Sequence, residues 1–298
     1  MMAASFIIMD QAMSNQQIIL KLSCHDQIGV VAKVSNHFAE QQFNIIESSQ
    51  FEDPDTSLFF MRTVLENAGD EVSMDDIREQ FTPVADTLGM RWQIHDRQAK
   101  PKVLIAVSNW GHCLNAMLNA WRNQSLPVDV VGVVSNHRIM ESMTDWYGLP
   151  FHYLPVESGH KGDQEARLLQ VYRDADADLL VLARYMQILS PALCDTLAGR
   201  IINIHHSFLP GFVGARPYHQ AYHRGVKQIG ATAHYVTADL DQGPIIEQAV
   251  ERVSHANSPQ ELTDIGRDIE AMVLNRAVKW HAEHRVLING VRTVVFNR

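Results

Sequence analysis

An amide and an imidazole interrupt an apolar run in the second half of the chain. The run spans 201–205, and within it Asn203 and His205 are separated by one isoleucine. In a strand, side chains two residues apart project from the same face, so Asn203 and His205 would lie together. An amide donor beside an imidazole is suited to holding a carbonyl oxygen as it gains negative charge. The same pair could instead satisfy buried backbone groups, and the pattern alone leaves both interpretations open.

A carboxylate follows this pair downstream, in a segment typical of a turn between two strands. Asp241 comes shortly before Gly243 and Pro244. Aspartate near glycine is common turn chemistry, so Asp241 on its own indicates only a turn. Placed beside Asn203 and His205, the same carboxylate could act as a base that takes a proton from water.

A pair of histidines raises the alternative of a metal site. His219 and His223 have the spacing of the two histidines in helical H-E-x-x-H zinc sites. Gln220 stands where that motif has its glutamate, and no nearby cysteine or cluster of carboxylates supplies the remaining ligands. We therefore expect no metal ion.

The segment 108–112 follows an apolar run and could open a helix, which is a place where phosphate binds. It contains a single glycine, Gly111, beside the bulky Trp110, and it does not match G-x-G-x-x-G. Because a phosphate cradle needs several approachable backbone N–H groups, we expect neither a good phosphate site nor a dinucleotide site here.

A second segment after an apolar run could line the pocket of a flat aromatic ligand. An ordinary connection from a strand to a helix would show the same spacing. The residues of this segment are Arg184, Tyr185, Met186, Gln187 and Ile188.

The elements that must position these residues form a large α/β domain, expected over residues 102–298. Continuous apolar runs alternate with helical patterns, as in a doubly wound, Rossmann-like sheet. The last helix begins with a capping box, Ser258 to Glu261, with proline at its first position. Its apolar face is expected to hold Leu262, Ile265, Ile269, Met272, Val273 and Trp280. The expected strands are 103–107, 128–134, 151–154, 179–183, 200–205, 229–237 and 245–253.

A smaller domain is expected over residues 16–95, joined to the large one by the polar linker 96–101. Strand-like runs at 18–22, from 44, at 58–64 and at 90–94 alternate with two helical patterns. The first helix should bury Val30, Val31, Val34 and Phe38, and the second should begin after Ser73. The order βαββαβ is that of ferredoxin-like domains.

Bulk composition narrows the classes of function. Hydrophobic residues make up 46% of the 298 residues, which indicates a packed globular protein. Lys and Arg total 25 against 34 Asp and Glu, and a net charge of −9 disfavours nucleic acid and anionic membrane surfaces as partners. Three dispersed cysteines suit a reducing compartment, residues 1–15 lack the basic start of a signal peptide, and no apolar run could span a bilayer. We therefore expect a cytoplasmic protein.

The motifs above resemble those of the folate-dependent formyltransferase family, and the small domain resembles an ACT domain, a module common in amino-acid-sensing proteins. The resemblance runs from Gln17 to nearly the end of the chain. The residues that carry it are Asn203-Ile204-His205, Ser207, Leu209-Pro210, the segment 214–220, His234, Asp241 and Gly243-Pro244.

The resemblance implies a set of roles. Asn203 would orient a formyl oxygen, His205 would stabilise the oxyanion and Asp241 would manage proton transfer. His234 would support the loop of Asp241, and segment 184–188 would wrap the pterin ring with backbone and apolar groups. The implied activity is hydrolysis of 10-formyltetrahydrofolate to formate and tetrahydrofolate, without a cofactor, which supplies formate for purine biosynthesis and balances the one-carbon folate pool. Pairing of ACT domains would give a homo-oligomer, and an amino acid would be its effector.

Two departures from the family pattern bear on these implications. Members that formylate a ribonucleotide carry a phosphate loop rich in glycine and serine where this chain has 109–112, so the resemblance favours water as the acceptor. The usual D-R-P-G turn of ACT domains appears here as Asp26-Gln27-Ile28-Gly29, which leaves open whether an amino acid binds. Two rival functions therefore remain: a formyltransferase with an amine acceptor, and an amino-acid sensor without catalysis.

Overall fold

The computed structural model describes residues 16–157, 160–211 and 217–297. The chain divides into two compact units, with the boundary between Ala99 and Lys100, and each unit is described by itself.

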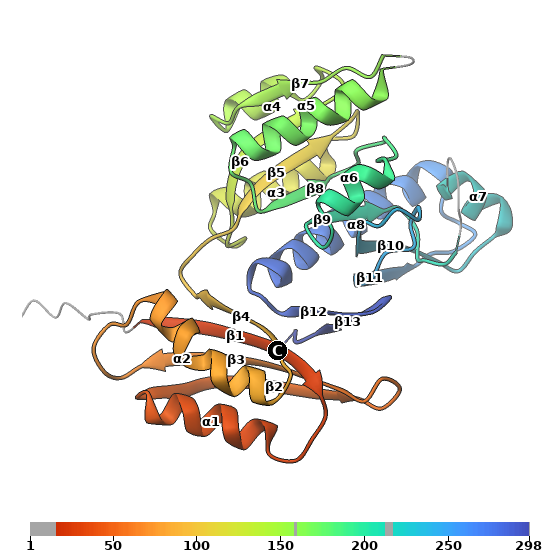
Figure 1. Cartoon of the computed structure of the whole chain (residues 1–298). Helices are drawn as coiled ribbons and strands as arrows, with labels where there is room; N and C mark the ends of the chain where they lie inside the picture. Colours follow the sequence, from red (N-terminus) through yellow and green to blue (C-terminus); the bar gives the residue numbers. More distant parts are fainter. Residues whose placement is uncertain (1–15, 158–159, 212–216, 298) are drawn as a thin grey trace, which may run out of the picture. The chain divides into compact units, whose positions relative to one another are not determined.

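The first unit is a four-stranded antiparallel sheet covered on one face by two helices (Figure 1). Its strand order is β2-β3-β1-β4 in a βαββαβ chain, so the expected ferredoxin-like fold is confirmed. The elements are β1 Gln17–His25, α1 Val30–Glu40, β2 Phe43–Asp53, β3 Leu58–Asn67, α2 Met74–Thr87 and β4 Arg91–Asp96.

Local sequence explains both helices of this unit. In α1, Val30, Val34 and Phe38 recur every fourth residue and are buried, whereas Val31 lies off that stripe and is 37% exposed. The expectation that Val31 is buried was therefore wrong. Ser73 caps α2 by accepting a hydrogen bond from the backbone N–H of Asp76, as its sequence predicts.

The second unit is built on a seven-stranded sheet with the order β11-β10-β9-β8-β5-β6-β7. Strands β5 to β9 are parallel, while β10 runs antiparallel to both of its neighbours, β9 and β11. The expected α/β fold is thus confirmed, with an antiparallel edge. The strands are β5 Lys102–Val107, β6 Asp129–Ser135, β7 Phe151–Tyr153, β8 Leu179–Leu182, β9 Ile201–His205, β10 Gln228–Tyr235 and β11 Ile245–Arg252.

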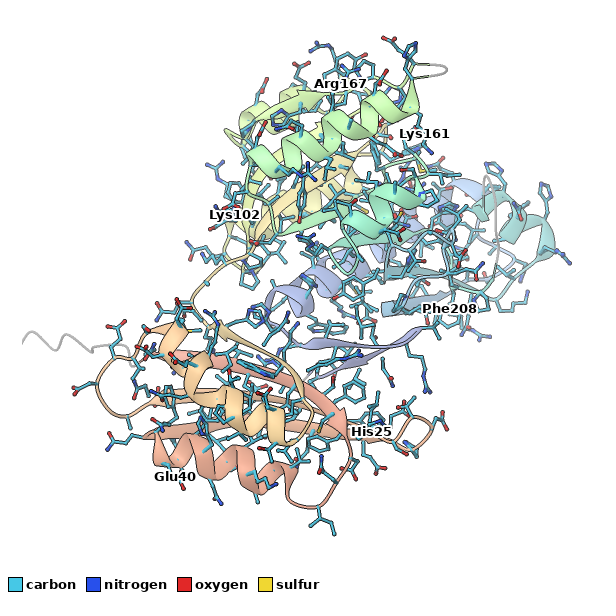
Figure 2. All side chains as sticks on the ribbon, viewed as in Figure 1. His25, Glu40, Lys102, Lys161, Arg167 and Phe208 are labelled. Carbon is cyan, nitrogen blue, oxygen red and sulfur yellow. The ribbon has the colours of Figure 1, made fainter. Side chains whose placement is uncertain are left out.

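Helices cover both faces of this sheet. Alternate residues of β5 point to opposite sides: one set packs with α3 and α8, the other with α5 and α6. Charged side chains of α5 such as Lys161 and Arg167 project outward (Figure 2). Across the described residues no helix is long and apolar enough to cross a membrane. The helices are α3 His112–Arg122, α4 Glu141–Trp146, α5 Lys161–Asp174, α6 Pro191–Thr196, α7 Pro217–Arg224 and α8 Pro259–Ala282.

Helix α8 begins as the sequence predicts and buries most of the expected face, including Leu262, Ile269 and Val273. Ser258 and Glu261 form the full capping box. Met272 is 38% exposed, so its expected place on the buried face was wrong; Gly266 and Glu270 are buried instead. A short hairpin that the sequence analysis did not anticipate follows α8, with strands β12 Val286–Asn289 and β13 Arg292–Val295.

The connectivity of the large sheet places a crevice at the ends of β5 and β8. From β5 the chain winds outward through β6 and β7, then crosses back to β8 on the other side of β5 and continues to β9. Ligands bind at such switch points, outside the carboxyl ends of parallel strands. The segments that begin at Ser108 and Arg184 leave the sheet there, and Asn203 and His205 lie at the end of neighbouring β9.

Candidate active site

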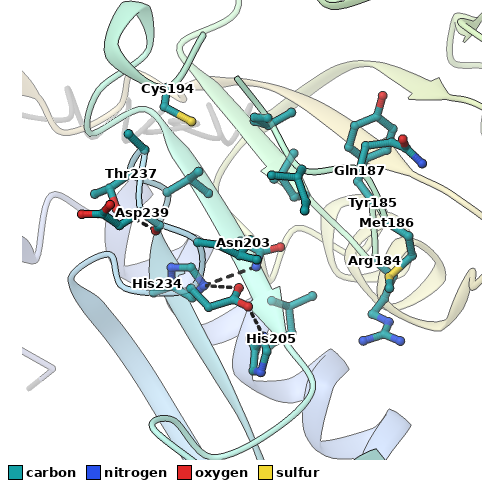
Figure 3. Close-up of a pocket in the computed structure, with 18 of the residues that line it drawn as sticks. Arg184, Tyr185, Met186, Gln187, Cys194, Asn203, His205, His234, Thr237 and Asp239 are labelled. Carbon is teal, nitrogen blue, oxygen red and sulfur yellow. Dashed lines mark hydrogen bonds and ion pairs between the residues drawn. The ribbon is translucent and has the colours of Figure 1, made fainter. Parts of the chain in front are cut away.

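The pairing of β9 with β10 brings the candidate residues together. In the antiparallel register Asn203 lies opposite His234, and His205 opposite Thr232. The Nδ2 atom of Asn203 is 3.3 Å from Nε2 of His234. The loop between β10 and β11 returns Asp241 to the same place, where its Oδ2 is 3.2 Å from Nδ1 of His205 (Figure 3).

A chain of hydrogen bonds fixes the tautomer of His234. The Nδ1 atom of this ring is 2.8 Å from the carbonyl oxygen of Tyr235, which can only accept. The neutral ring therefore carries its hydrogen on Nδ1, and Nε2 accepts from the amide nitrogen of Asn203. Gly243 packs directly on the same carbonyl, where any Cβ would collide with it. The glycine thus preserves the backbone approach on which the orientation of His234 depends.

Asp241 is held as a carboxylate. Its backbone adopts a left-handed conformation with φ of 56°, which turns the side chain back toward the strands. The hydrogen bond from His205, followed by the influence of His234, holds the pKa of the Asp241 carboxyl well below its ordinary value, although partial burial opposes this. His234 Nε2 lies 3.7 Å from Asp241 Oδ1, beyond hydrogen-bond length, so His205 is the direct partner.

His205 has one ring nitrogen engaged and one available. The residue is 6% exposed, and its Nδ1 donates to Asp241. Its Nε2 is buried and has no hydrogen-bond partner among the described residues. The ring of His206 stacks on that of His205 at 5.0 Å between centroids and 16° between planes, which restricts how the His205 ring can turn. A buried nitrogen without a partner is the position from which a bound ligand would be contacted.

A cavity of about 260 Å³ is lined by all nine residues to which the family resemblance assigns a role in catalysis or folate binding. Asn203, His205 and His234 lie on one side of the cavity and residues 184–187 on the other (Figure 3). Asp241, which pairs with His205, belongs to the first wall, and Ile188 continues the second. Further lining residues, which the sequence analysis missed, are Leu182, Leu189, Cys194, Ile204, His206 and residues 236–240.

The five residues of the second wall contribute in different ways. Met186 and Ile188 are 55% and 60% exposed and offer apolar surface to the cavity. Tyr185 is buried, and its hydroxyl accepts a hydrogen bond from Gln164. The guanidinium of Arg184 points away from Asn203 toward α8 (Figure 3).

Each of the two units matches a known protein family. The formyl transferase family model matches residues 101–278, and the ACT domain model matches residues 18–81. The formyltetrahydrofolate deformylase of Corynebacterium sp. (strain P-1) is 47% identical over 279 residues, which are 93% of this chain and 97% of that protein. The protein of the same name from Bacillus subtilis (strain 168) is 44% identical, with 93% of each chain covered.

Solved structures separate two groups of relatives. The formyltetrahydrofolate deformylase structure from Burkholderia mallei has a TM-score of 0.90 at 49% identity and covers 94% of this chain and 99% of that one. A glycinamide ribonucleotide transformylase from Symbiobacterium toebii, at 29% identity and a TM-score of 0.63, covers 94% of its own length but 66% of this chain. The deformylases therefore match across both units. The chain belongs to the formyltetrahydrofolate deformylase family.

In this member of the deformylase family, Ser108 connects the segment after β5 to the pocket. The backbone N–H of Ser108 donates to the carbonyl of Arg184, and the N–H of Met186 donates to the Ser108 hydroxyl. That hydroxyl in turn donates to Asn136, at 2.6 Å. Ser108 thereby fixes the start of the wall formed by residues 184–188, a function that its sequence context did not reveal.

The rest of segment 108–112 is occupied by side-chain contacts. Trp110 is 46% exposed. The guanidinium carbon of Arg267 lies over its ring, 4.7 Å from the ring centre. A Cβ on Gly111 would press against the sulfur of Met140. The imidazole of His112 turns toward α8, where its Nε2 is 2.8 Å from Oε2 of Glu270. The side chains of Trp110 and His112 thus both contact residues of α8.

The deformylase fold keeps His219 and His223 away from the pocket, since both are exposed on α7 and line no part of the cavity. Within the described ranges, His112, Cys113 and Glu270 are the one trio whose ligand-type atoms lie close together. Burial raises the pKa of the Cys113 thiol well above its usual value, and Arg184 already pairs with Glu270, so this trio is poorly suited to a cation. Residues 214–216 of the family motif lie outside the described residues.

Proposed function

We propose that this chain hydrolyses 10-formyltetrahydrofolate to formate and tetrahydrofolate, with Asn203, His205 and Asp241 as its catalytic residues. The observation that carries the proposal is the convergence of these side chains on one cavity in a chain that matches deformylases over both of its units. The formyl group on N10 is an amide. Its hydrolysis requires attack by water at carbon, stabilisation of a tetrahedral oxyanion and protonation of the departing nitrogen.

Asn203 and His205 hold the formyl oxygen. One N–H of the Asn203 amide is directed to His234, and the second is free to donate to the oxygen as it becomes negative. A single donor of this kind contributes on the order of 3 kcal/mol to the transition state. His205 adds the buried Nε2 that has no protein partner, and the Asp241 carboxylate holds the ring in place through its Nδ1.

Asp241 transfers a proton from the attacking water to N10. In the free protein its low pKa makes it a weak base, because the contact with His205 stabilises the ionised form. Bound folate would cover the cavity and exclude bulk water while leaving the attacking water beside Asp241, and this desolvation raises the basicity of the carboxylate. Asp241 then accepts a proton from the attacking water and returns it to N10. Acid–base assistance of this kind is worth roughly 10²–10⁴-fold in rate.

The second wall of the cavity binds the folate. The exposed side chains of Met186 and Ile188 provide flat apolar surface, and the backbone of residues 184–188 provides donors and acceptors for a pterin ring. His234 does not react; it orients Asn203 and supports the loop of Asp241.

The proposal also covers cofactors, domain boundaries, cellular location and assembly. The chemistry requires no cofactor and no metal ion. The domain boundaries are 16–95 for the ACT-like regulatory domain, 96–101 for the linker and 102–298 for the catalytic domain. The protein acts in the cytoplasm, apart from nucleic acid and membranes, where formate supplies purine biosynthesis and the reaction balances the one-carbon folate pool. The ACT-like domain pairs with a second copy to give a homo-oligomer and takes an amino acid as effector.

A competition assay tests the choice of acceptor. A second candidate function, transfer to an amine, is favoured by the likeness to a glycinamide ribonucleotide transformylase. The purified chain is given 10-formyltetrahydrofolate labelled in the formyl group, with and without saturating glycinamide ribonucleotide. We expect label in formate at the same rate in both reactions. Label on the ribonucleotide at a comparable rate would replace hydrolysis by transfer, and no release at all would favour a sensor without catalysis.

A further inference from the structure

A buried carboxylate outside the cavity connects three elements of the large unit. Glu270 lies in the middle of α8, is 1% exposed and does not line the cavity. The hydroxyl of Tyr218 on α7 donates to its Oε1 at 2.6 Å, and Nε2 of His112 lies 2.8 Å from its Oε2. The Nε of Arg184, at the end of the strand β8, forms an ion pair with the same Oε2 at 3.4 Å.

Glu270 is ionised despite its burial. Burial by itself pushes the pKa of this carboxyl upward, but His112, Arg184 and Tyr218 together hold it below its usual value. An ionised carboxylate away from solvent needs such partners, because without them its burial is strongly unfavourable. The negative charge of Glu270 is therefore balanced by the three groups that bond to it. None of these groups belongs to a proposed catalytic residue.

Helix α8 carries a second feature that serves this network. Gly266 lies one turn before Glu270, and a Cβ there would collide with the ring and hydroxyl of Tyr218. Glycine within a helix is unfavourable by about 1 kcal/mol relative to alanine. Its presence here is explained by the space it leaves for the Tyr218 ring to reach Glu270.

Arg184 links the network to the folate wall. It lines the cavity and is the first residue of segment 184–188. Its φ of 64° is in the left-handed region, which is unfavourable for a residue with a side chain. Two contacts hold it there: Ser108 N–H donates to its carbonyl, and Glu270 pairs with its guanidinium. Loss of the second contact would let Arg184 return to an ordinary conformation and turn the following residues away from the cavity.

We propose that Glu270 is a positioning residue for folate binding, which acts through Arg184 to hold segment 184–188 as one wall of the cavity. The proposal rests on the proposed function, since it names a determinant of how that site binds its substrate. The catalytic wall comes from β9 and the loop between β10 and β11, whereas Glu270 bonds to Tyr218, His112 and Arg184.

The primary test is Glu270→Gln, which keeps the shape of the side chain and removes its charge. We expect KM for 10-formyltetrahydrofolate to rise at least about tenfold, or about 1.4 kcal/mol, with kcat changed less than about threefold. A role in stability alone would lower the folded fraction, and with it the apparent kcat, and would leave KM unchanged. Glu283→Gln is the matched control, because Glu283 also pairs with an arginine but lies about 20 Å further along the helix.

Two other variants test the route through Arg184, and they decide the question if Glu270→Gln does not fold. Arg184→Met should reproduce the rise in KM, whereas Tyr218→Phe, which leaves the ion pair intact, should change KM less than about threefold. In the double variant Glu270→Gln/Arg184→Met the effects should not add, because both changes break one interaction. Additive effects, or a Tyr218→Phe effect as large as that of Arg184→Met, would overturn the proposal.

Failure of the inference is distinguishable from failure of the proposed function. If wild-type protein releases no formate, the proposed function fails. The same variants are then compared by titration with tetrahydrofolate, with the dissociation constant in place of KM. An unchanged KM or dissociation constant in folded Glu270→Gln protein would show that Glu270 does not position the folate wall.

Discussion

Replacing Asp241 by asparagine separates the charge of this side chain from its shape. The amide oxygen can still accept from Nδ1 of His205, which lies 3.2 Å from the carboxylate in the native protein. What is lost is the negative charge at the hydrogen bond with His205. A hydrogen bond to a charged group is worth about 1.5–3 kcal/mol, which in the transition state corresponds to about 10- to 150-fold in kcat.

Loss of proton transfer adds to this effect. An amide cannot take a proton from water, and removal of a general base typically costs roughly 10²–10⁴-fold. We therefore expect kcat of Asp241→Asn to fall at least about a hundredfold. Binding of folate should change less than about threefold, because most of the apolar surface for the ring comes from the opposite wall.

The assay is formate release followed with a coupled formate dehydrogenase, alongside titration with tetrahydrofolate. Asp239→Asn is the control, since Asp239 is an exposed carboxylate in the same loop and also lines the cavity. Near-normal turnover in Asp241→Asn would remove this carboxylate from the mechanism. Equal losses in both variants would indicate a general effect of loop charge instead.

Three further predictions concern stability and folding. Ser258→Ala removes the cap of α8 and should lower the free energy of unfolding by about 1 kcal/mol and the melting temperature by roughly 2–4 °C, measured by thermal circular dichroism, with formate release at 25 °C retained. Because the pKa of Asp241 is lowered by folding, its carboxylate stabilises the native state fully above about pH 4, and this contribution is lost progressively as the pH falls further; the difference in free energy of unfolding between wild-type and Asp241→Asn protein, measured with urea, should therefore be constant near neutral pH and shrink as the pH falls below about 4. A fragment starting at Lys100 should unfold in one cooperative thermal transition, and a non-cooperative melt would refute its independence.

Regular alternation of apolar runs and helical patterns made both folds predictable from sequence. In the first unit, the βαββαβ order alone leads to the sheet order that is observed. In the second, continuous apolar runs such as 103–107 are typical of strands buried on both faces, and that is where β5 lies. The pairing of Asn203 and His205 on one face followed from strand periodicity, since nothing beyond the period of two was needed.

Features that depend on tertiary partners were not predictable in the same way. The hairpin of β12 and β13 was missed because its strands are only four residues long, although Gly290 at the first position of the two-residue turn between them is a hairpin signal. Met272 is apolar and close to the helical stripe, yet it faces solvent. Sequence periodicity places apolar residues on the buried face of a helix. It therefore does not predict that Glu270 is buried in α8.

The burial of Glu270 was likewise not predictable from the sequence, because it depends on tertiary partners. A charged residue in an amphipathic helix is expected on the solvent side, and only its donors on distant elements make burial favourable. The direction of the Arg184 side chain was missed for the same reason, because its partner lies 86 positions further along the chain. The nearby Gly266, placed within an apolar helical face, was the one local sign that something large packs there.

The chain of hydrogen bonds from Tyr235 to Asn203 sets a rule for the polarity of inhibitors. Because the Tyr235 carbonyl fixes His234 as an acceptor at Nε2, the amide nitrogen of Asn203 faces His234 and Asp241, and the amide oxygen points the opposite way (Figure 3). A tight inhibitor must therefore present an acceptor, such as a formamide or nitrile, to the nitrogen end of Asn203. A scaffold that places an N–H there sets donor against donor, and shape complementarity elsewhere would have to overcome that repulsion.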